Sequence, residues 1–161
     1  MLPLVLDTSV VVKWFRQGEV LAEGALGLRQ AFLDGQAWIM VPSLLAYELA
    51  NVLRYKEDLT TAQVEEALGS LLDMGLDWIP PSSSLLRRVV AIARTHDITV
   101  YDGAFVALAE AWEAAFVTAD AQLARHLAAF PYVRFLGEMG EDAPSMDTGG
   151  GGTTGQALQG R

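Results

Sequence analysis

The sequence predicts an α/β fold in which a mostly parallel sheet is covered by helices on both faces. Five short apolar segments have the length and the flanking Gly, Pro or charged residues of buried strands. Longer segments with apolar residues at helical spacing lie between them, so strands and helices alternate along the chain. This alternation indicates parallel strands joined by helical crossovers, and in such sheets ligand sites form beyond the carboxyl ends of the strands.

Two of the predicted strands end at an acidic residue. The first, residues 3–6 (PLVL), stands directly before Asp7, and another, residues 115–118 (AFVT), ends two residues before Asp120. The remaining strands are predicted over residues 37–41, 76–79 and 132–136. Because the carboxyl ends of parallel strands share one edge of a sheet, we expect Asp7 and Asp120 to emerge at the same edge.

The predicted helices begin at ordinary capping signals. Ser43, Thr60 and the serine run 82–84 each stand where a helical pattern starts. The six helical segments cover residues 20–33, 43–55, 62–74, 85–95, 102–112 and 121–128. Every pair of consecutive strands is therefore separated by at least one helix, as a parallel sheet requires.

The chain of 161 residues, 52% of them hydrophobic, is long enough for one well-buried core. We expect one domain over residues 1–138 and a disordered tail over residues 139–161, which holds a glycine run and lacks apolar periodicity. The absence of cysteine excludes disulfides and thiolate metal sites. No apolar run approaches the length of a membrane span, so we expect a cytoplasmic protein without a membrane partner.

The net charge of −9 is unusual for a protein that handles RNA, because nucleic-acid affinity usually comes from clustered Lys and Arg. Residues 137–161 hold four acids and one Arg, which leaves −6 for residues 1–136. Four of these charges belong to the acidic residues considered next. Two divalent cations would neutralise them, so the acidity is compatible with a metal site without establishing one.

Glu48 is the acidic residue that is hardest to explain as part of a solvated surface. On a helix over residues 43–55 it falls between Leu44 and Val52, inside the apolar arc. A buried carboxylate must be partnered, neutralised or bound to a metal. The alternative is that the side chain reaches solvent from the edge of the apolar stripe.

Asp102 repeats this pattern, because it lies in the apolar arc of its helix, away from the charged face marked by Glu110. Each of Asp7, Asp102 and Asp120 has a simpler interpretation as a helix N-cap. Four such carboxylates at buried positions and strand ends could not all stay ionised together without cations. With oxygen ligands only, Mg²⁺ or Mn²⁺ fits better than Zn²⁺.

Four segments resemble the four acidic motifs of the PIN-domain nucleases, most closely the small VapC-type toxins of bacteria and archaea. They are LDTSVVVKWF, PSLLAYELANVL, TVYDGAFVALAE and FVTADAQLA, and the similarity spans about residues 2–136. The resemblance implies a three-layer α/β/α sandwich with a five-stranded parallel sheet, a catalytic quartet that binds metal, and two supporting hydroxyl groups. The quartet is Asp7, Glu48, Asp102 and Asp120, and the hydroxyl residues are Ser9 and Thr118.

The resemblance also implies a homodimeric toxin that an antitoxin neutralises. The glycine-rich tail is a departure, since compact members of the family lack it.

Several other residues are weaker candidates. Basic side chains on the surface could contact RNA phosphates, although most surface Lys and Arg residues contact only solvent. These candidates are Lys13, Arg16, Arg54, Arg87, Arg88, Arg94 and Arg125. His96 and His126 lie near helix ends, where capping or solvent contact is the usual role. The four tryptophans are expected in the core, with base stacking by Trp14 or Phe15 as an alternative.

The leading functional hypothesis is a Mg²⁺- or Mn²⁺-dependent endoribonuclease toxin that hydrolyses RNA by a metal-activated water. One rival is a non-catalytic module that uses the same fold to bind RNA or a protein. The other is a Mg²⁺-dependent phosphatase or receiver-like protein, but the phosphatase pattern needs a second Asp where this chain has Ser9.

Overall fold

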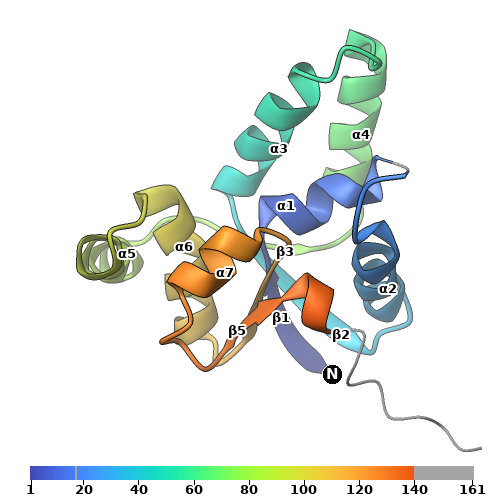
Figure 1. The fold of residues 1–161 in the computed structure, drawn as a ribbon. Coiled ribbons are helices and arrows are strands. Elements are labelled where there is room, and N and C mark those ends of the chain that lie inside the picture. The colour runs from blue at the N-terminus through green and yellow to red at the C-terminus, as the bar shows by residue number, and fades with distance from the viewer. Residues whose placement is uncertain (17, 140–161) are drawn as a thin grey trace, which may run out of the picture.

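Five parallel strands form one sheet in the computed structural model, which describes residues 1–16 and 18–139 (Figure 1). The predicted five-stranded parallel sheet is thereby confirmed. The strands are β1 (Leu2–Leu6), β2 (Ala37–Pro42), β3 (Asp77–Ile79), β4 (Ala115–Thr118) and β5 (Val133–Phe135), in the spatial order β3-β2-β1-β4-β5. Of the predicted tail, residues 140–161 lie outside the described residues.

The helices between the strands confirm the six predicted helical segments, with ends that differ by up to two residues. They are α2 (Ala22–Leu33), α3 (Leu44–Arg54), α4 (Thr61–Asp73), α5 (Ser83–His96), α6 (Val100–Ala111) and α7 (Ala121–His126). Local sequence sets several of these starts. At α4, for example, the Thr60 hydroxyl accepts from the Gln63 N–H, and the Gln63 side chain accepts from the Thr60 N–H.

Helices lie on both sides of the sheet (Figure 1). Helix α6 packs against β1, β2 and β4, with α5 behind it, whereas α2 packs against β2 on the opposite side. Helices α3 and α4 form a hairpin that projects from the body beyond the carboxyl ends of the strands (Figure 1). Within the described residues, no helix combines the length and the hydropathy that a membrane crossing needs.

Strands β1 and β4 lie next to each other at the centre of the sheet. Leu6 pairs with Val117, and the Asp7 N–H donates to the Val117 carbonyl at 2.9 Å. From β1 the chain moves outward through β2 and β3, and it returns to the other side of β1 for β4 and β5. The strand order therefore reverses between β1 and β4, and ligand sites of open α/β sheets form at such a switch point.

Helix α6 is the most deeply buried helix. Its segment from Phe105 to Ala109 is shielded from solvent, and the Phe105 ring stacks on Phe116 of β4 with centroids 5.9 Å apart. This packing fixes the first turn of α6, including Asp102, against the carboxyl edge of the sheet. Apolar burial of this kind supplies most of the stability of a helix in a protein.

Two features differ from the sequence-based expectation. Residues 8–14 form a short helix α1 (Thr8–Val11) and a 3₁₀ turn η1 (Val12–Trp14) that the periodicity does not predict, and η2 (Leu136–Glu138) is a second such turn. The expectation that all four tryptophans lie in the core is wrong for Trp112, which is 46% exposed and packs edge-on against Trp38. Its ring covers the half-buried Trp38 at the surface.

Gly103 allows α5 and α6 to approach closely beside Asp102. A Cβ atom at this position would lie 3.2 Å from the Val89 carbonyl oxygen, which belongs to the helix backbone and cannot easily move. We expect Gly103→Ala to lower the free energy of unfolding by about 1 kcal/mol, because overpacking outweighs the gain in helix propensity. Gly69→Ala in α4 is the control, since its Cβ would meet nothing within 4 Å.

Urea unfolding of both variants checks this prediction. Gly69→Ala should be neutral or more stable by up to about 1 kcal/mol. Equal stabilisation of both variants would show that the α5–α6 contact is not tight.

Candidate metal centre at the carboxyl edge of the sheet

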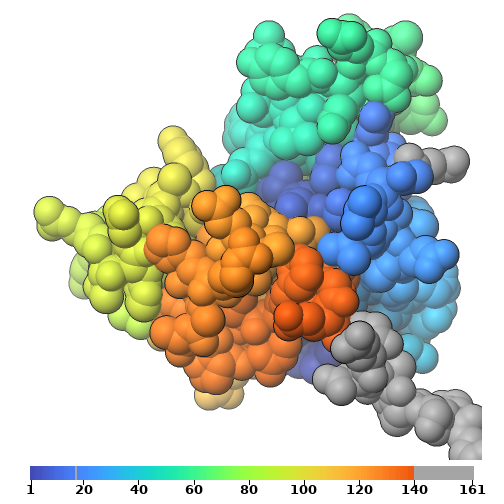
Figure 2. Space-filling model, in the orientation of Figure 1, coloured from blue at the N-terminus to red at the C-terminus, as the bar shows by residue number. Residues whose placement is uncertain are grey.

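The four acidic residues of the sequence analysis come from four elements that meet at the carboxyl edge of the sheet. Asp7 follows β1, Glu48 lies on α3, Asp102 lies in the first turn of α6, and Asp120 begins α7. The space-filling view shows a hollow at this edge, with atoms of the N-terminal segment (dark blue) recessed between the α3–α4 projection and α7 (Figure 2). The quartet therefore surrounds the switch point between β1 and β4.

Asp7 is the most buried member, with 7% of its surface exposed. Its Oδ2 accepts hydrogen bonds from the Ser9 hydroxyl at 2.6 Å and from the Thr118 hydroxyl at 2.8 Å. Burial raises the pKa of the Asp7 carboxyl, the hydrogen bonds from Ser9 and Thr118 oppose this rise, and the charge of Asp120 adds to it. Asp7 precedes α1, but its side chain makes no capping hydrogen bond there.

Ser9 and Thr118 connect the ends of β1 and β4. The Ser9 hydroxyl accepts from the Ala119 N–H at 2.9 Å, and the Thr118 hydroxyl accepts from the Asp120 N–H at 3.1 Å. Each hydroxyl thus receives a backbone hydrogen bond and donates its own proton to Asp7. This arrangement fixes the orientation of the Asp7 carboxylate and places Asp120 close to it.

Glu48 is half-buried and accepts a hydrogen bond from the Thr8 hydroxyl at its Oε1, at 3.0 Å. Burial raises the pKa of Glu48 to about 7; the bond from Thr8 acts against this, and the charges of Asp7 and Asp102 add to the rise. The apolar arc predicts that this side chain points toward the core, and the structure places it half-buried beside Thr8, within the influence of Asp7 and Asp102. Thr8 is a contact residue that the sequence analysis missed, and its place between Asp7 and Ser9 was the only signal for it.

Asp102 does not cap its helix, so the capping interpretation is wrong for this residue. Thr99 is the N-cap of α6, and its hydroxyl accepts from the Asp102 N–H at 3.0 Å. The half-buried Asp102 carboxyl has a raised pKa, first because of burial and then because of the charges of Asp7 and Asp120. The first turn of α6 therefore presents a carboxylate to the site without using it for helix capping.

Asp120 does cap its helix, as the simpler interpretation predicts. Its Oδ1 accepts from the N–H groups of Gln122 and Leu123 at 2.9 and 3.0 Å. The residue is exposed, and its Oδ2 has no hydrogen-bond partner among the described residues. One oxygen atom thus holds the start of α7 while the other remains free at the edge of the site.

The four carboxylates influence one another electrostatically but do not form a finished ligand shell. In the described part of the chain, no three acidic or histidine side chains are close enough together to hold a metal ion as they stand. No Lys, Arg or His forms an ion pair with any of the four within these residues. Like charges without a cation repel, so open spacing is the arrangement that electrostatics favours.

The chemistry of this donor set fits a hard divalent cation. The side chains supply carboxylate oxygens, with hydroxyl groups behind two of them, and the sequence contains no cysteine. Mg²⁺ and Mn²⁺ prefer such oxygen ligands. Burial is the main cause of the raised pKa values of Glu48 and Asp102, and a cation between the carboxylates would remove the repulsion that adds to it.

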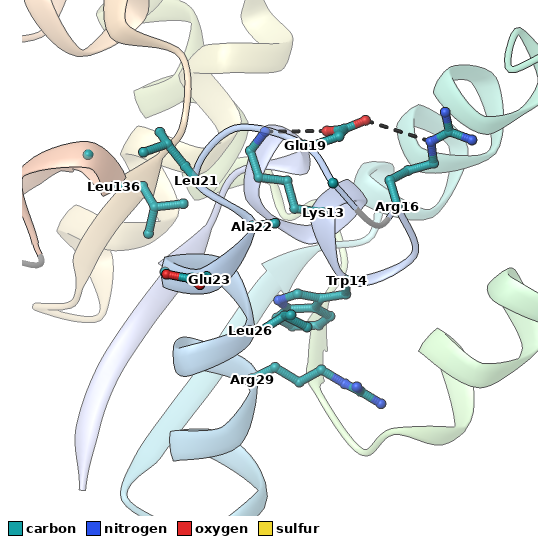
Figure 3. Close-up of a pocket in the computed structure, with 13 residues that line it drawn as sticks. Lys13, Trp14, Arg16, Glu19, Leu21, Ala22, Glu23, Leu26, Arg29 and Leu136 are labelled. Atoms are coloured by element: carbon teal, nitrogen blue, oxygen red, sulfur yellow. Dashed lines mark hydrogen bonds and ion pairs between the residues drawn. The ribbon is translucent and has the colours of Figure 1, made fainter.

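Asp102 and Asp120 line the same small cavity, which has a volume of about 230 Å³ and is otherwise walled mostly by polar residues such as Thr99 and His126. A much larger cavity of about 910 Å³ lies elsewhere, between η1, α2 and η2, and none of the four acids lines it (Figure 3). The chemistry of the carboxylates, and not cavity size, therefore locates the candidate metal centre.

Apart from Lys13 and Arg16, the basic residues considered for RNA contact are scattered, and none of them touches the four acids among the described residues. Lys13 and Arg16 take part in ion pairs beside the large cavity. On α3, the Arg54 guanidinium stacks over Tyr55; on α5, Arg87 donates to the Ser83 hydroxyl and Arg88 pairs with Glu110. Arg94 and Arg125 are in the last turns of α5 and α7.

His96 and His126 both stand at helix ends, as expected. The His126 ring contacts the His96 carbonyl through Nε2, so it caps the end of α5. Trp14, the candidate for base stacking, is buried and donates from Nε1 to the Ala25 carbonyl at 2.8 Å. Its ring therefore has a packing role.

Comparison with known proteins identifies one domain family and several solved structures with the same fold. The PIN domain family model matches residues 4–127. Among solved structures, VapBC2 of Rickettsia felis, bound to a DNA fragment from its promoter, has a TM-score of 0.62 at 16% identity and covers 83% of this chain and 97% of its own. No curated protein sequence matches the chain.

Two further solved structures share the fold. VapC20 of Mycobacterium tuberculosis, a toxin that cleaves the sarcin–ricin loop, has a TM-score of 0.62 at 15% identity and covers 81% of this chain and 98% of its own. FitAcB of Neisseria gonorrhoeae has a TM-score of 0.59 at 17% identity, with 84% and 99% covered. At these identities the likeness is one of fold.

Proposed function

The chain belongs to the PIN domain family, and from this premise we propose that it is a metal-dependent endoribonuclease that hydrolyses RNA phosphodiester bonds. Asp7, Glu48, Asp102 and Asp120 are the proposed ligands of Mg²⁺ or Mn²⁺. The observation that supports this most strongly is the convergence of four carboxylates, three with raised pKa values and none with a cationic partner in the described residues, at the switch point of a parallel sheet.

A divalent cation held there supplies two things: it activates a water molecule for attack on phosphorus, and it stabilises the leaving oxygen. The side chains around the site orient the carboxylates that would hold the cation. Ser9 and Thr118 hold the Asp7 carboxylate in one orientation, and Thr8 does the same for Glu48. Hydrogen bonds donated by hydroxyl groups favour the ionised form of a carboxylate, and a carboxylate must be ionised to bind a metal.

The biological context is part of the same proposal. Structures of the same fold include VapBC and FitA–FitB assemblies and a toxin that cleaves RNA. We propose that this protein is the toxin of a toxin–antitoxin pair in the cytoplasm, that it acts as a homodimer, and that a cognate antitoxin neutralises it. Growth arrest on expression alone, relieved by co-expression of the antitoxin, tests the assignment, and a strictly monomeric protein without growth effect contradicts it.

A second candidate function is a non-catalytic module that binds RNA or protein through the same fold. One observation favours it: the acids are not gathered into a finished ligand shell, and Asp120 uses one oxygen to cap α7. The phosphatase or receiver-like alternative is weaker, because Ser9 at the position of the second Asp donates its hydroxyl proton to Asp7.

The direct test is incubation of the purified protein with total RNA in Mg²⁺, in Mn²⁺ and in chelator. We expect defined RNA fragments only with metal present. Binding of RNA without cleavage under all three conditions would support the non-catalytic module, and equal cleavage in chelator would exclude the metal mechanism.

Thr8→Val tests whether the hydroxyl behind Glu48 contributes to the reaction. The substitution keeps the shape of the side chain and removes the 3.0 Å hydrogen bond. We expect RNA cleavage to fall about 10–100-fold, the usual effect of losing a group that orients a metal ligand. Cleavage assays over a range of Mg²⁺ concentrations should show that excess metal partly restores the rate.

The matched control is Thr95→Val, on the exposed part of α5. It should leave cleavage unchanged. If both variants cleave like the wild type, Glu48 does not depend on Thr8 for its function.

A further inference from the structure

Three basic side chains surround one carboxylate beside the large cavity. The Glu19 carboxylate lies 3.3 Å from the Lys13 ammonium, 3.7 Å from Arg16 Nε and 3.9 Å from the Lys56 ammonium. Figure 3 shows the Lys13 and Arg16 side chains pointing to Glu19 from two sides. We call Lys13, Arg16 and Lys56 the cation cluster.

The cation cluster has more positive than negative charge. Its second acidic neighbour is Asp58, whose carboxylate accepts from Arg16 Nη1 at 2.6 Å. Three cations therefore face two carboxylates, in a protein whose net charge is −9. Four of the five ion pairs among the described residues belong to this group. Since basic charge is scarce in this chain, its concentration at one place is informative.

The position of the cation cluster relates it to the proposed metal centre. Lys13 lies on η1, which continues α1 directly, and α1 begins after Asp7. Six residues of helical backbone span about 10 Å, or about three nucleotides along one strand of a nucleic acid helix. A strand with one phosphate at the acidic edge can therefore bring a phosphate about three nucleotides away to Lys13.

The adjoining cavity adds a further cation. Arg29 lines it together with Lys13 and Arg16, and the Arg29 Nε atom is buried without a hydrogen-bond acceptor among the described residues. Buried donors of this kind normally have acceptors. The Arg29 guanidinium therefore adds positive charge to the wall of the cavity.

We propose that the cation cluster binds a backbone phosphate of the RNA strand about three nucleotides from the cleaved bond, and that Glu19 occupies this phosphate site in the free protein. The inference rests on the proposed ribonuclease function for the identity of the anion. A carboxylate held by several cations resembles a bound phosphate in charge and in acceptor geometry. RNA must displace the Glu19 side chain, so Glu19 weakens RNA binding by competition.

The melting temperature of a Glu19 variant distinguishes the proposed competition with RNA from a purely structural role of Glu19. Lys13, Arg16, Glu19 and Lys56 are all partly exposed, and ion pairs of this kind contribute little to folding. Loss of the Glu19 charge should therefore leave the melting temperature nearly unchanged while it frees Lys13 and Lys56 and leaves Arg16 paired only with Asp58.

The test uses Glu19→Gln in the full chain, with Glu23→Gln as the matched control. The control removes the same charge beside the same cavity, but Glu23 forms no ion pair within the described residues. Binding of a short fluorescent single-stranded RNA is measured by anisotropy in chelator, so that cleavage does not contribute. A salt series gives the number of phosphates that the protein neutralises.

We expect Glu19→Gln to tighten RNA binding on the order of 5-fold and to make the salt dependence steeper by roughly 0.7 for each additional phosphate that is neutralised. Glu23→Gln should change affinity much less. Lys13→Gln combined with Glu19→Gln should remove the increase in affinity. Equal effects of Glu19→Gln and Glu23→Gln would show that only the overall charge of the protein matters. A lower melting temperature of Glu19→Gln with unchanged binding would show that Glu19 is a structural residue. Either outcome overturns the proposal.

This design separates the inference from the function on which it rests. If the wild type fails to cleave RNA with metal but Glu19→Gln still binds RNA selectively more tightly, the phosphate site stands and the ribonuclease proposal falls. If the wild type cleaves and the tighter binding is absent, only the phosphate site is wrong.

Discussion

Asp7→Asn should abolish most metal-dependent RNA cleavage while leaving the metal-free protein at least as stable as the wild type. The substitution keeps the shape of a side chain that is 7% exposed and that accepts two hydroxyl hydrogen bonds. It removes a charge that burial and Asp120 both disfavour. Because it also removes a metal ligand, cleavage should fall on the order of 100-fold or more, beyond the effect of losing an outer hydrogen bond.

Cleavage assays and thermal melts in chelator measure the two effects side by side. Asp73→Asn at the exposed end of α4 removes the same charge far from the site in sequence and should not change cleavage. If Asp7→Asn melts at a lower temperature in chelator and still cleaves RNA, the four acids are structural and the proposed function is wrong.

Metal binding should stabilise the protein, and without metal its stability should fall as the pH rises. The folded state raises the pKa of Glu48 from its usual 4.5 to about 7, and it raises those of Asp7 and Asp102 as well. A carboxyl group with a raised pKa binds its proton more tightly in the folded state than in the unfolded state. Its stabilising contribution is therefore complete below about pH 4.5 and is lost as the pH rises through about 7.

Addition of Mg²⁺ or Mn²⁺ at about 100 times its dissociation constant should reverse this loss at neutral pH. Ligand linkage predicts a stabilisation of about 2.7 kcal/mol, or roughly 5–10 °C in melting temperature. Glu48→Gln removes both a ligand and the titrating group, so it should flatten the pH dependence in chelator and reduce the metal-induced shift.

Differential scanning calorimetry across the pH range, with chelator and with each metal, measures these effects. Asp73→Asn again serves as the control and should keep the wild-type response. A wild-type melting temperature that does not change with metal would argue against a metal centre at these residues.

Much of the fold and the placement of the acids follow from short-range patterns. Apolar segments such as AFVT have the length of buried strands, and their alternation with helical segments predicts the observed parallel sheet. Asp7 and Asp120 stand at strand ends, so parallel pairing alone brings them to one edge. Glu48 lies within an apolar arc, so a helix of fixed period directs it toward the core, where the structure shows it half-buried beside Thr8.

Other features could not be predicted from these patterns, because packing against the core or competition between nearby capping residues decides them. The valine run of residues 10–12 has the composition of a strand, yet it forms α1 and η1, where its side chains are buried in the core. Thr99 and Asp102 can both cap a helix. The Thr99 hydroxyl accepts from the Asp102 N–H and so caps α6 in place of Asp102. Burial and competing hydrogen bonds thus override the propensity of single residues.

The sequence by itself determined the order of the five strands and of the helices α2 to α7, the parallel sheet, and the positions of the four carboxylates at strand ends and on helices, because periodicity and strand polarity are local properties of the chain. Only the tertiary structure decided which hydroxyls hold those carboxylates, since Thr118 reaches Asp7 across 111 positions and Thr8 reaches Glu48 across 40. It also decided that Lys13, Arg16 and Lys56 gather around Glu19. Such pairings depend on how elements pack in space, which the local pattern of the sequence does not encode.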